Sequence, residues 1–412
     1  MRLALLGNHI DGVCFAYAAA ASGRHEILSV SSPSISPEQL ALLGAKVARI
    51  GDLEEVLADP AVDSVIVASG SANRAAYLRR ALQSERDVVC IHPLDWSPDP
   101  AYEAAMIRRD TGRALLPLLH EALHPAFLRL GALHQSGEAR LGPLVLVEME
   151  IHGSGGVLEV AGAREDRPSL PGWHRLRILG GEVAEVSALA FGEGAAADQP
   201  LLVVGRFEKS GMFQAQFLPL RPAPRVCITI LGAEGRAELL FPMGEPGPAF
   251  LTWHNHQGQA CEESWDPWDP WPALLTLFEQ AVARPAKPDA DRKPAALGAV
   301  TWQDAVRCLE LDAAARRSVE KRRVGGMEYQ EASEEVGFKG TMTLVGCGLI
   351  WLILTVLFVS LWFPMIRWAI IPVLTIFLAL QLFRWIIPRG AKQNGGTKEE
   401  SEHNHRGTEA QS

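Results

Sequence analysis

The stretch Leu3-Ala-Leu-Leu-Gly7-Asn8-His9-Ile10-Asp11-Gly12 opens the chain and decides its fold. Its apolar residues have the length of a buried strand ending at Gly7, and the small apolar residues 13–21 have the density of a packed helix. A strand, a glycine turn and a helix begin a dinucleotide-binding βαβ unit, where the N–H groups of the helix start bind a diphosphate. The residues expected to contact it are Gly7, Asn8, His9, Ile10 and Gly12.

His9 stands where the fingerprint Gly-x-Gly-x-x-Gly has its middle glycine. That glycine lets the backbone approach the phosphates, so an imidazole there either fills the phosphate pocket or touches the phosphates directly. The polar residues at 8, 9 and 11 also interrupt the apolar run, which favours a buried strand over a signal peptide.

Alternating strand and helix patterns continue beyond this turn and predict a parallel sheet with helices on both faces. The predicted strands are 26–30, 46–50, 62–68, 87–90 and 114–119, and the predicted helices are 37–43, 52–57 and 73–84. Ser31 and Ser32 follow the second strand, where this fold often carries an acidic residue for the ribose hydroxyls. The sequence therefore does not distinguish NAD from NADP.

The amino-acid composition limits the classes of protein to which the chain can belong. The chain has 412 residues, 48% hydrophobic and 21% charged, which is enough for two folded domains and more. A formal net charge of −9 argues against nucleic acid as a partner. The six cysteines form no C-x-x-C pair, which indicates free thiols in a reducing compartment rather than disulfides or a zinc knuckle.

A second domain is predicted after the parallel sheet. Residues 144–151 alternate like a strand with one wet face, and further strands are expected at 182–190, 201–208, 212–218, 225–231 and 236–241. An open, mainly antiparallel sheet covered by helices suits an α+β domain for substrate binding and homo-oligomerisation. The tryptophans of W-D-P-W-D-P-W, residues 265–271, either stack on a sugar ring or anchor the helix expected at 273–282, and we favour the anchor.

The order of these segments resembles the Gfo/Idh/MocA oxidoreductases over about the first 325 residues. The resemblance lies in D-L-E-E-V-L-A-D-P-A-V-D-S-V-I-V-A-S, in V-V-C-I-H-P-L, and in Leu123-His124-Pro125-Ala126, which is similar to the family's R-F-H-P. It continues in residues 232–235, similar to G-T-E-G, and in 298–317, similar to the family's closing helix. It implies NAD(P)-linked oxidation or reduction of a hydroxyl or carbonyl group on a sugar, cyclitol or related small molecule.

The resemblance also implies site residues. His92 stands at the lysine of the family's E-K-P motif and His174 at the histidine of its D-x-G-x-H segment, so these two are the predicted catalytic residues. An imidazole that titrates near neutrality suits acid/base catalysis. The alternative is that His92, which precedes Pro93, only forms part of a turn and does no chemistry. Ser31, Ser69, Gly70 and Pro93 complete the expected nucleotide site. Arg175 and Arg177 indicate a solvated face around His174.

A rival motif is His120-Glu121-Ala122-Leu123-His124, which matches the zinc-protease pattern H-E-x-x-H. That chemistry needs both histidines on one face of a helix, with Glu148 or Glu150 as a conceivable third ligand. Pro117 and Pro125 leave little room for a helix, so we expect no metal site.

The C-terminal part predicts a membrane anchor. Residues 341–363 and 368–387 are apolar runs of bilayer length, separated by Pro364 and a single charge, Arg367. Tryptophans near the run ends suit interfacial anchors, and basic residues at the outer ends favour both ends in the cytoplasm. A lipid bilayer is therefore a predicted partner, with localisation in a bacterial-type inner membrane and the soluble domains facing the cytoplasm.

The predicted organisation has five parts. These are a Rossmann-like dinucleotide-binding domain (1–122), an α+β domain (123–327), a linker (328–340), a transmembrane helical hairpin (341–388) and a disordered polar tail (389–412). The leading hypothesis is a membrane-tethered oxidoreductase using NAD or NADP. The alternative is a catalytically inactive relative that binds nucleotides or assembles partners at the membrane, and a zinc protease is a remote third.

Overall fold

A computed structural model describes residues 1–32, 35–44, 47–95, 97–153, 170–190, 200–218, 224–255, 257–283, 296–321 and 325–327. The chain divides into two compact units, residues 1–333 and 334–412, and every described residue lies in the first. The predicted linker, transmembrane hairpin and polar tail lie outside the described residues. Within the described ranges, no helix combines the length and the apolar character needed to cross a bilayer.

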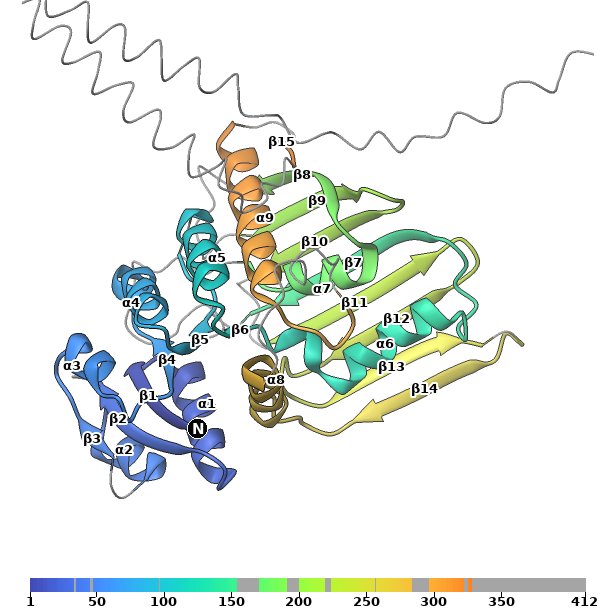
Figure 1. Cartoon of the computed structure of the whole chain (residues 1–412). Coiled ribbons are helices and arrows are strands. Elements are labelled where there is room, and N and C mark those ends of the chain that lie inside the picture. The colour runs from blue at the N-terminus through green and yellow to red at the C-terminus, as the bar shows by residue number, and fades with distance from the viewer. Residues whose placement is uncertain are drawn as a thin grey trace, which may run out of the picture. The chain divides into compact units, whose positions relative to one another are not determined.

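The first sheet confirms the predicted parallel arrangement. Its six strands run in the order β3-β2-β1-β4-β5-β6, the order of a Rossmann fold (Figure 1). The strands are β1 (Arg2–Gly7), β2 (Glu26–Ser31), β3 (Ala48–Arg49), β4 (Ser64–Ala68), β5 (Asp87–Ile91) and β6 (Leu115–Leu118). The helices between them are α1 (Ile10–Ala21), α2 (Pro37–Leu43), α3 (Leu53–Ala58), α4 (Ser71–Gln83) and α5 (Asp99–Thr111).

Local chemistry explains where these helices begin. Ser36 and Gln39 form a capping box at the start of α2, and the Asp52 side chain accepts the Glu54 N–H at 3.1 Å at the start of α3. α1 begins at Ile10, three residues earlier than the pattern predicted, because His9 caps it. Strand β4 is buried along its whole length, as expected for a parallel strand covered on both faces.

The second sheet has nine strands in the order β14-β13-β12-β11-β7-β10-β9-β8-β15. It is antiparallel except where β7 pairs with β10, so the predicted mainly antiparallel sheet is confirmed. The strands are β7 (Leu144–His152), β8 (Val183–Ala190), β9 (Leu201–Phe207), β10 (Met212–Leu218), β11 (Arg225–Gly232), β12 (Arg236–Phe241), β13 (Ala249–His254), β14 (Ala260–Trp265) and β15 (Gly325–Gly326). The hairpin β13–β14 was not predicted; it extends the sheet by pairing with β12.

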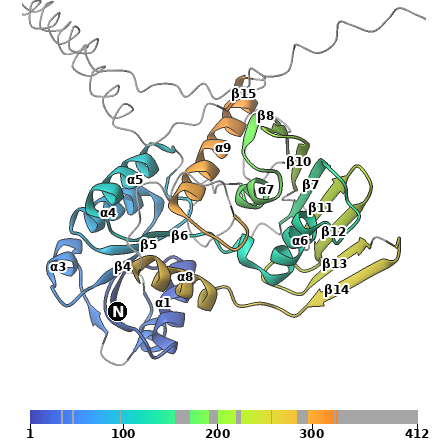
Figure 2. The same cartoon turned by 45° about the vertical axis from the view of Figure 1, so that its right-hand side comes forward.

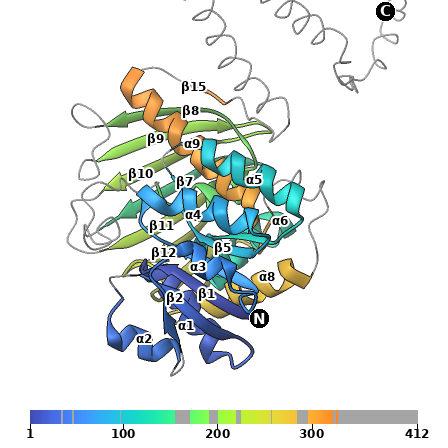
Figure 3. The same cartoon turned by 60° about the vertical axis from the view of Figure 1, so that its left-hand side comes forward.

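Helices α6 (Pro125–Ser136), α7 (Trp173–Gly180) and α9 (Trp302–Lys321) lie on one face of this sheet (Figure 2). α9 also lies beside α5, and the Trp302 Nε1–H donates to the Ala101 carbonyl at 2.9 Å (Figure 3). α8 (Trp271–Ala283) returns to the first sheet, where Phe278 packs edge-to-face on Phe15 of α1. α9, the predicted closing helix, and α8 therefore join the two sheets into one unit.

The other face of the nine-stranded sheet is covered by no element among the described residues. Side chains on it include Leu189, Met212 and Leu231, which are 65%, 55% and 38% exposed. The pairing registers place Met212 and Leu231 on either side of Leu146, so these three apolar side chains are neighbours across the sheet.

Candidate functional site

The glycine turn after β1 is built for close approach of the backbone to β4. Gly7 has φ +110°, and a Cβ there would lie 2.2 Å from the Ala68 carbonyl oxygen. A Cβ on Gly12 would lie 2.2 Å from the Ala68 Cβ. The outer two glycines of the fingerprint therefore keep their structural roles, namely the tight turn and the contact of helix with strand.

His9, at the middle position, caps helix α1. Its Nδ1 accepts the Asp11 N–H at 3.3 Å and lies 3.7 Å from the Asp11 carboxylate, and its side chain is 20% exposed. The imidazole thus occupies one of the N–H groups that a diphosphate would otherwise take. Asn8 and Ile10, on either side, are exposed.

The structure brings the predicted nucleotide residues to one edge of the sheet. Ser31 ends β2, Ser69 follows β4, Gly70 caps α4 and Pro93 follows β5, so all lie with the glycine turn at the carboxyl ends of the strands. Dinucleotides bind at this edge in Rossmann folds. The Ser69 hydroxyl is buried and, within the described part of the chain, has no hydrogen-bond partner. A tight glycine turn and an unpaired hydroxyl at the strand ends fit a dinucleotide, with His9 as the group that must turn aside or donate a hydrogen bond to it.

His92 lies in the loop after β5, and its peptide bond to Pro93 is cis. Removal from water lowers the pKa of its imidazole to about 3, and the charge of Arg74 and the nearby His174 add to the effect. From the sequence, an imidazole that titrates near neutrality was expected here. In this structure His92 is instead neutral at physiological pH, able to donate or accept a hydrogen bond but a weak base.

Arg74 is a site residue that the sequence analysis missed. It belongs to α4 and is only 5% exposed, and its Nε–H donates to the Ser69 carbonyl at 3.0 Å. A second N–H donates to the Pro93 carbonyl. The guanidinium therefore bridges the loops after β4 and β5 beside His92. The sequence carries no signal for this, because an arginine early in an amphipathic helix reads as solvent-exposed.

His174 is placed near His92 but is buried, with 1% exposure. Its Nε2 lies 3.3 Å from the Ala299 carbonyl and its Nδ1 lies 3.8 Å from the Asp304 carboxylate. Burial lowers its pKa. The expected solvated face was wrong, because Arg175 and Arg177 are 2% and 1% exposed and form buried ion pairs.

Asp304 places a buried carboxylate 3.8 Å from the Nδ1 atom of His174. Its Oδ1 accepts from Arg177 at 2.8 Å, and its Oδ2 accepts the backbone N–H and the hydroxyl of Thr301 at 2.9 and 2.7 Å. These contacts and His174 hold the pKa of Asp304 below its usual value although burial alone would raise it. The residue lies on the closing helix, far along the chain, so only folding brings it to His174.

The residues of H-E-x-x-H do not form the helix that zinc chemistry requires. Residues Glu121–Leu123 make a single 3-10 turn, and His124 leaves it with ψ 130° to cap α6 through the Ala126 N–H at 3.1 Å. Glu121 accepts the Gly172 N–H at 2.9 Å and so holds the start of α7. In the described ranges no group of three His, Cys, Asp or Glu side chains is arranged to hold a metal ion.

The tryptophan segment agrees with the favoured interpretation as an anchor. The Trp268 ring lies 5.3 Å from the ring of His124, and the Trp271 ring lies 5.6 Å from that of His120. Trp271 then begins α8. These rings are packed on protein side chains where the chain returns to the first sheet.

Comparison with protein-family models gives a match over residues 4–117. The model is GFO_IDH_MocA, described as an oxidoreductase family with an NAD-binding Rossmann fold. The matched residues run from Ala4 in β1 to Pro117 in β6 and so include residues from all six strands of the first sheet. No curated protein sequence matches the chain.

Solved structures share the arrangement of both sheets. GenD2 from gentamicin A biosynthesis, in complex with NAD, is 22% identical with a TM-score of 0.64, covering 80% of this chain and 97% of its own. An oxidoreductase from Agrobacterium radiobacter, in complex with NAD+, L-tartaric acid and magnesium, is 15% identical (TM-score 0.63; 79% and 98% covered). A levoglucosan dehydrogenase in complex with NADH and levoglucosan is 12% identical (TM-score 0.63; 80% and 100% covered). At these identities the likeness establishes the fold.

Proposed function

We propose that this chain, whose first domain matches the Gfo/Idh/MocA oxidoreductase family model, is an NAD(P)-dependent oxidoreductase acting on a sugar, cyclitol or related hydroxyl or carbonyl compound. The observation that carries the proposal is the strand edge itself, where Gly7 and Gly12 allow the tight turn and the close packing of α1 on β4, and where Ser69, Arg74 and His92 gather. Related folds, including a levoglucosan dehydrogenase, support the substrate class.

The chemistry assigned to His92 follows from its neutral state. A bound nicotinamide would supply or accept the hydride. His92, with its pKa near 3, would donate a hydrogen bond from a neutral imidazole to the substrate oxygen, and the proton that this oxygen gains on reduction or loses on oxidation would be exchanged with solvent water. Arg74 fixes the two loops on which Ser69 and Pro93 stand and adds a positive charge beside the developing negative oxygen.

One observation favours the second candidate, a catalytically inactive relative. His9 already caps the helix start where a diphosphate would bind. In that case the chain would keep the fold as a scaffold, and nucleotide affinity would be lost.

Nucleotide binding separates the two candidates. The purified full chain is titrated with NADH and NADPH, and binding is followed by nucleotide fluorescence. Saturable binding supports the oxidoreductase, whereas no binding of either nucleotide up to millimolar concentration refutes it and leaves the scaffold.

The role of His92 needs a matched pair of variants. His92→Gln should abolish turnover of sugar and cyclitol substrates while nucleotide affinity stays nearly unchanged. His254→Gln, an exposed histidine on β13 remote from the glycine turn in sequence and in sheet, is the control and should behave as wild type. Unchanged turnover in His92→Gln would show that another group holds the substrate oxygen.

Membrane tethering belongs to the same proposal. Its support is the pair of apolar runs within residues 341–388, each long enough to span a bilayer, and the basic residues at their outer ends. The full chain should resist extraction of membranes with alkaline carbonate, and a protease added to intact spheroplasts should leave both ends uncut. Release by carbonate would contradict the anchor.

Association of two copies through the nine-stranded sheet is also proposed. The uncovered face carries the neighbouring apolar side chains Leu146, Met212 and Leu231 and, elsewhere on it, the exposed Leu189, and a self-complementary face suits a two-fold dimer.

A further inference from the structure

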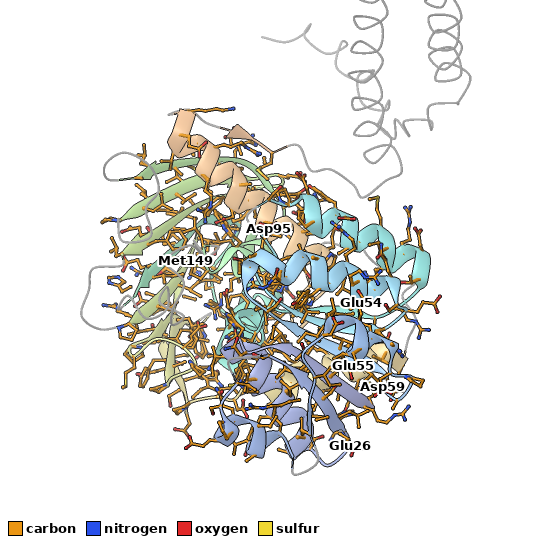
Figure 4. All side chains as sticks on the ribbon, turned by 90° about the vertical axis from the view of Figure 1, so that its left-hand side faces the viewer. Glu26, Glu54, Glu55, Asp59, Asp95 and Met149 are labelled. Atoms are coloured by element: carbon orange, nitrogen blue, oxygen red, sulfur yellow. The ribbon has the colours of Figure 1, made fainter. Side chains whose placement is uncertain are left out.

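A partly exposed histidine, His120, stands where β6 leaves the first sheet. β5 and β6 pair in parallel, with Ile91 opposite Leu118, and neighbouring strands lie about 5 Å apart. Figure 4 shows Asp95, in the loop after β5, on the side of the first domain that faces the nine-stranded sheet. His92 and His120 therefore leave the sheet on neighbouring strands, at the edge where dinucleotides bind in Rossmann folds.

The surroundings of His120 come from three parts of the chain. Its ring lies 5.6 Å from the ring of Trp271, the first residue of α8. The next residue, Glu121, accepts the Gly172 N–H at 2.9 Å and so ties this turn to the start of α7, the helix that carries His174. The imidazole thus lies where the end of β6 meets the starts of α7 and α8.

The segment before Trp271 also lies near the glycine turn. Burial, with the charges of Asp11 and Asp269 added, raises the pKa of the Cys14 thiol, so Asp269 is close to the first turns of α1. The Asp269 carboxylate accepts the Trp271 N–H at 3.2 Å. His120 and Trp271 therefore lie beside the helix start that can bind a diphosphate.

The His120 ring has a nitrogen available for a ligand. Nδ1 is buried and has no hydrogen-bond partner within the part of the chain that the structure describes, whereas Nε2 lies on the exposed part of the residue. The charged groups around it are held by other partners: the carboxylates of Glu121 and Asp269 each accept a backbone N–H, and Arg175 donates to the Glu121 carbonyl at 3.0 Å. An imidazole with an open nitrogen is the side chain best suited to proton transfer near neutral pH.

Three other imidazoles near this edge are buried. Removal from water lowers the pKa of His92 to about 3 and the pKa of His124 to about 4, and it also lowers the pKa of His174. The His124 Nδ1 accepts the Ala126 N–H as the cap of α6. At neutral pH these rings are uncharged, so His92 can donate a hydrogen bond to a substrate oxygen but is too weak a base to take its proton.

We infer that His120 is the acid/base residue of the proposed reaction, an inference that rests on the proposed function. On oxidation the substrate C–H bond breaks and its electron pair leaves with the hydrogen as hydride to the nicotinamide. The substrate O–H bond breaks at the same carbon, and its proton passes to the open nitrogen of His120 and from there to water. On reduction His120 gives a proton to the substrate oxygen and regains one from water.

The first test measures the accessibility of His120 and needs no substrate. The full chain is treated with diethyl pyrocarbonate, which transfers an ethoxycarbonyl group to accessible imidazole nitrogens, and the labelling of each histidine is followed by peptide mass spectrometry. NADH or NADPH at about ten times its Kd should slow the labelling of His120 about tenfold, because only the unliganded protein reacts. ADP-ribose, which lacks the nicotinamide, should leave it reactive. The exposed His254 on β13 is the control and should be labelled equally in every sample.

The second test measures turnover. His120→Gln should lower kcat about 10²–10⁴-fold for any sugar or cyclitol that the wild type oxidises, the usual contribution of an acid/base residue. The variant should also lose the fall in kcat that the wild type shows on acidification, while its NADH affinity stays nearly unchanged. His254→Gln is the control and should behave as wild type. His120 makes no side-chain hydrogen bond within the described ranges, so its replacement should leave Tm near the wild-type value.

The outcomes separate two failures. If a nucleotide binds but His120 is labelled as fast as in the free protein, or if His120→Gln keeps the wild-type kcat, the inference is overturned while the proposed oxidoreductase stands. Equal protection by ADP-ribose and NADH would also overturn it, because His120 would then face the diphosphate and not the reacting carbon. If neither nucleotide binds in the fluorescence titration, the proposed function fails and the inference fails with it.

Discussion

Replacing Arg177 by methionine should destabilise the protein strongly. The guanidinium is 1% exposed and pairs with Asp304 at 2.8 Å and Glu182 at 2.6 Å. Its removal leaves the Asp304 carboxylate, whose side chain is 5% exposed, without its arginine. Breaking a buried pair in this way costs about 3–5 kcal/mol. For a unit of this size, roughly 2 °C per kcal/mol gives a fall in Tm of about 6–10 °C.

The assay is thermal unfolding followed by tryptophan fluorescence, with all variants purified under the same conditions. Arg206→Met is the matched control. Arg206 of β9 pairs with Glu185 of β8 at 3.1 Å, but unlike the Arg177 pair both of these side chains are about half exposed. An exposed pair contributes about 0–1 kcal/mol, so the control should lose no more than roughly 2 °C. Equal losses in the two variants would refute the reasoning.

The pH dependence gives a second check with a definite sign. In wild type the pKa of Asp304 is lowered, so its contribution to stability is present above its unfolded pKa and is lost as pH falls through the folded value, below about 4. Without Arg177 the pKa of Asp304 rises, so on acidification the variant protonates this carboxylate first and loses the cost of an unpaired buried charge. The difference in Tm should therefore be largest near pH 7 and shrink on acidification; a difference that grows would contradict the assignment.

Three further predictions concern the nucleotide turn, the site and the uncovered sheet. Gly12→Ala should cost about 1–3 kcal/mol, because the new methyl meets the Ala68 Cβ at 2.2 Å, whereas Gly51→Ala, which meets nothing within 4 Å, should cost less than half as much in the same unfolding assay. Arg74→Gln should raise the pKa of His92 above about 3, as measured by NMR titration of its ring protons; an unchanged value would show that Arg74 exerts no field there. Met212→Lys should weaken self-association in sedimentation experiments while Tm stays near wild type, and an unchanged mass would show that copies do not meet through this face.

The order of short local sequence patterns along the chain was enough to predict the fold. A strand ending at Gly7, capped helices such as α3 behind Asp52, and fully apolar strands such as β4 are local features, and local features can be read from sequence. Their alternation then permits few topologies, because parallel strands need crossover helices. The parallel first sheet and the mainly antiparallel second sheet were both predicted in this way.

The site was predictable only in part, because its electrostatics depend on residues that are distant in sequence. The sequence identified which residues follow the strands, from Gly7 and Ser31 to Ser69 and His92, since the ends of parallel strands share one edge. It did not reveal that Arg74 lies buried beside His92, that Asp304 of the closing helix faces His174, or that Arg177 is buried. A charged side chain is read from sequence as solvated, and only packing decides which charges are removed from water and paired; that packing sets the pKa of His92 and the burial of His174.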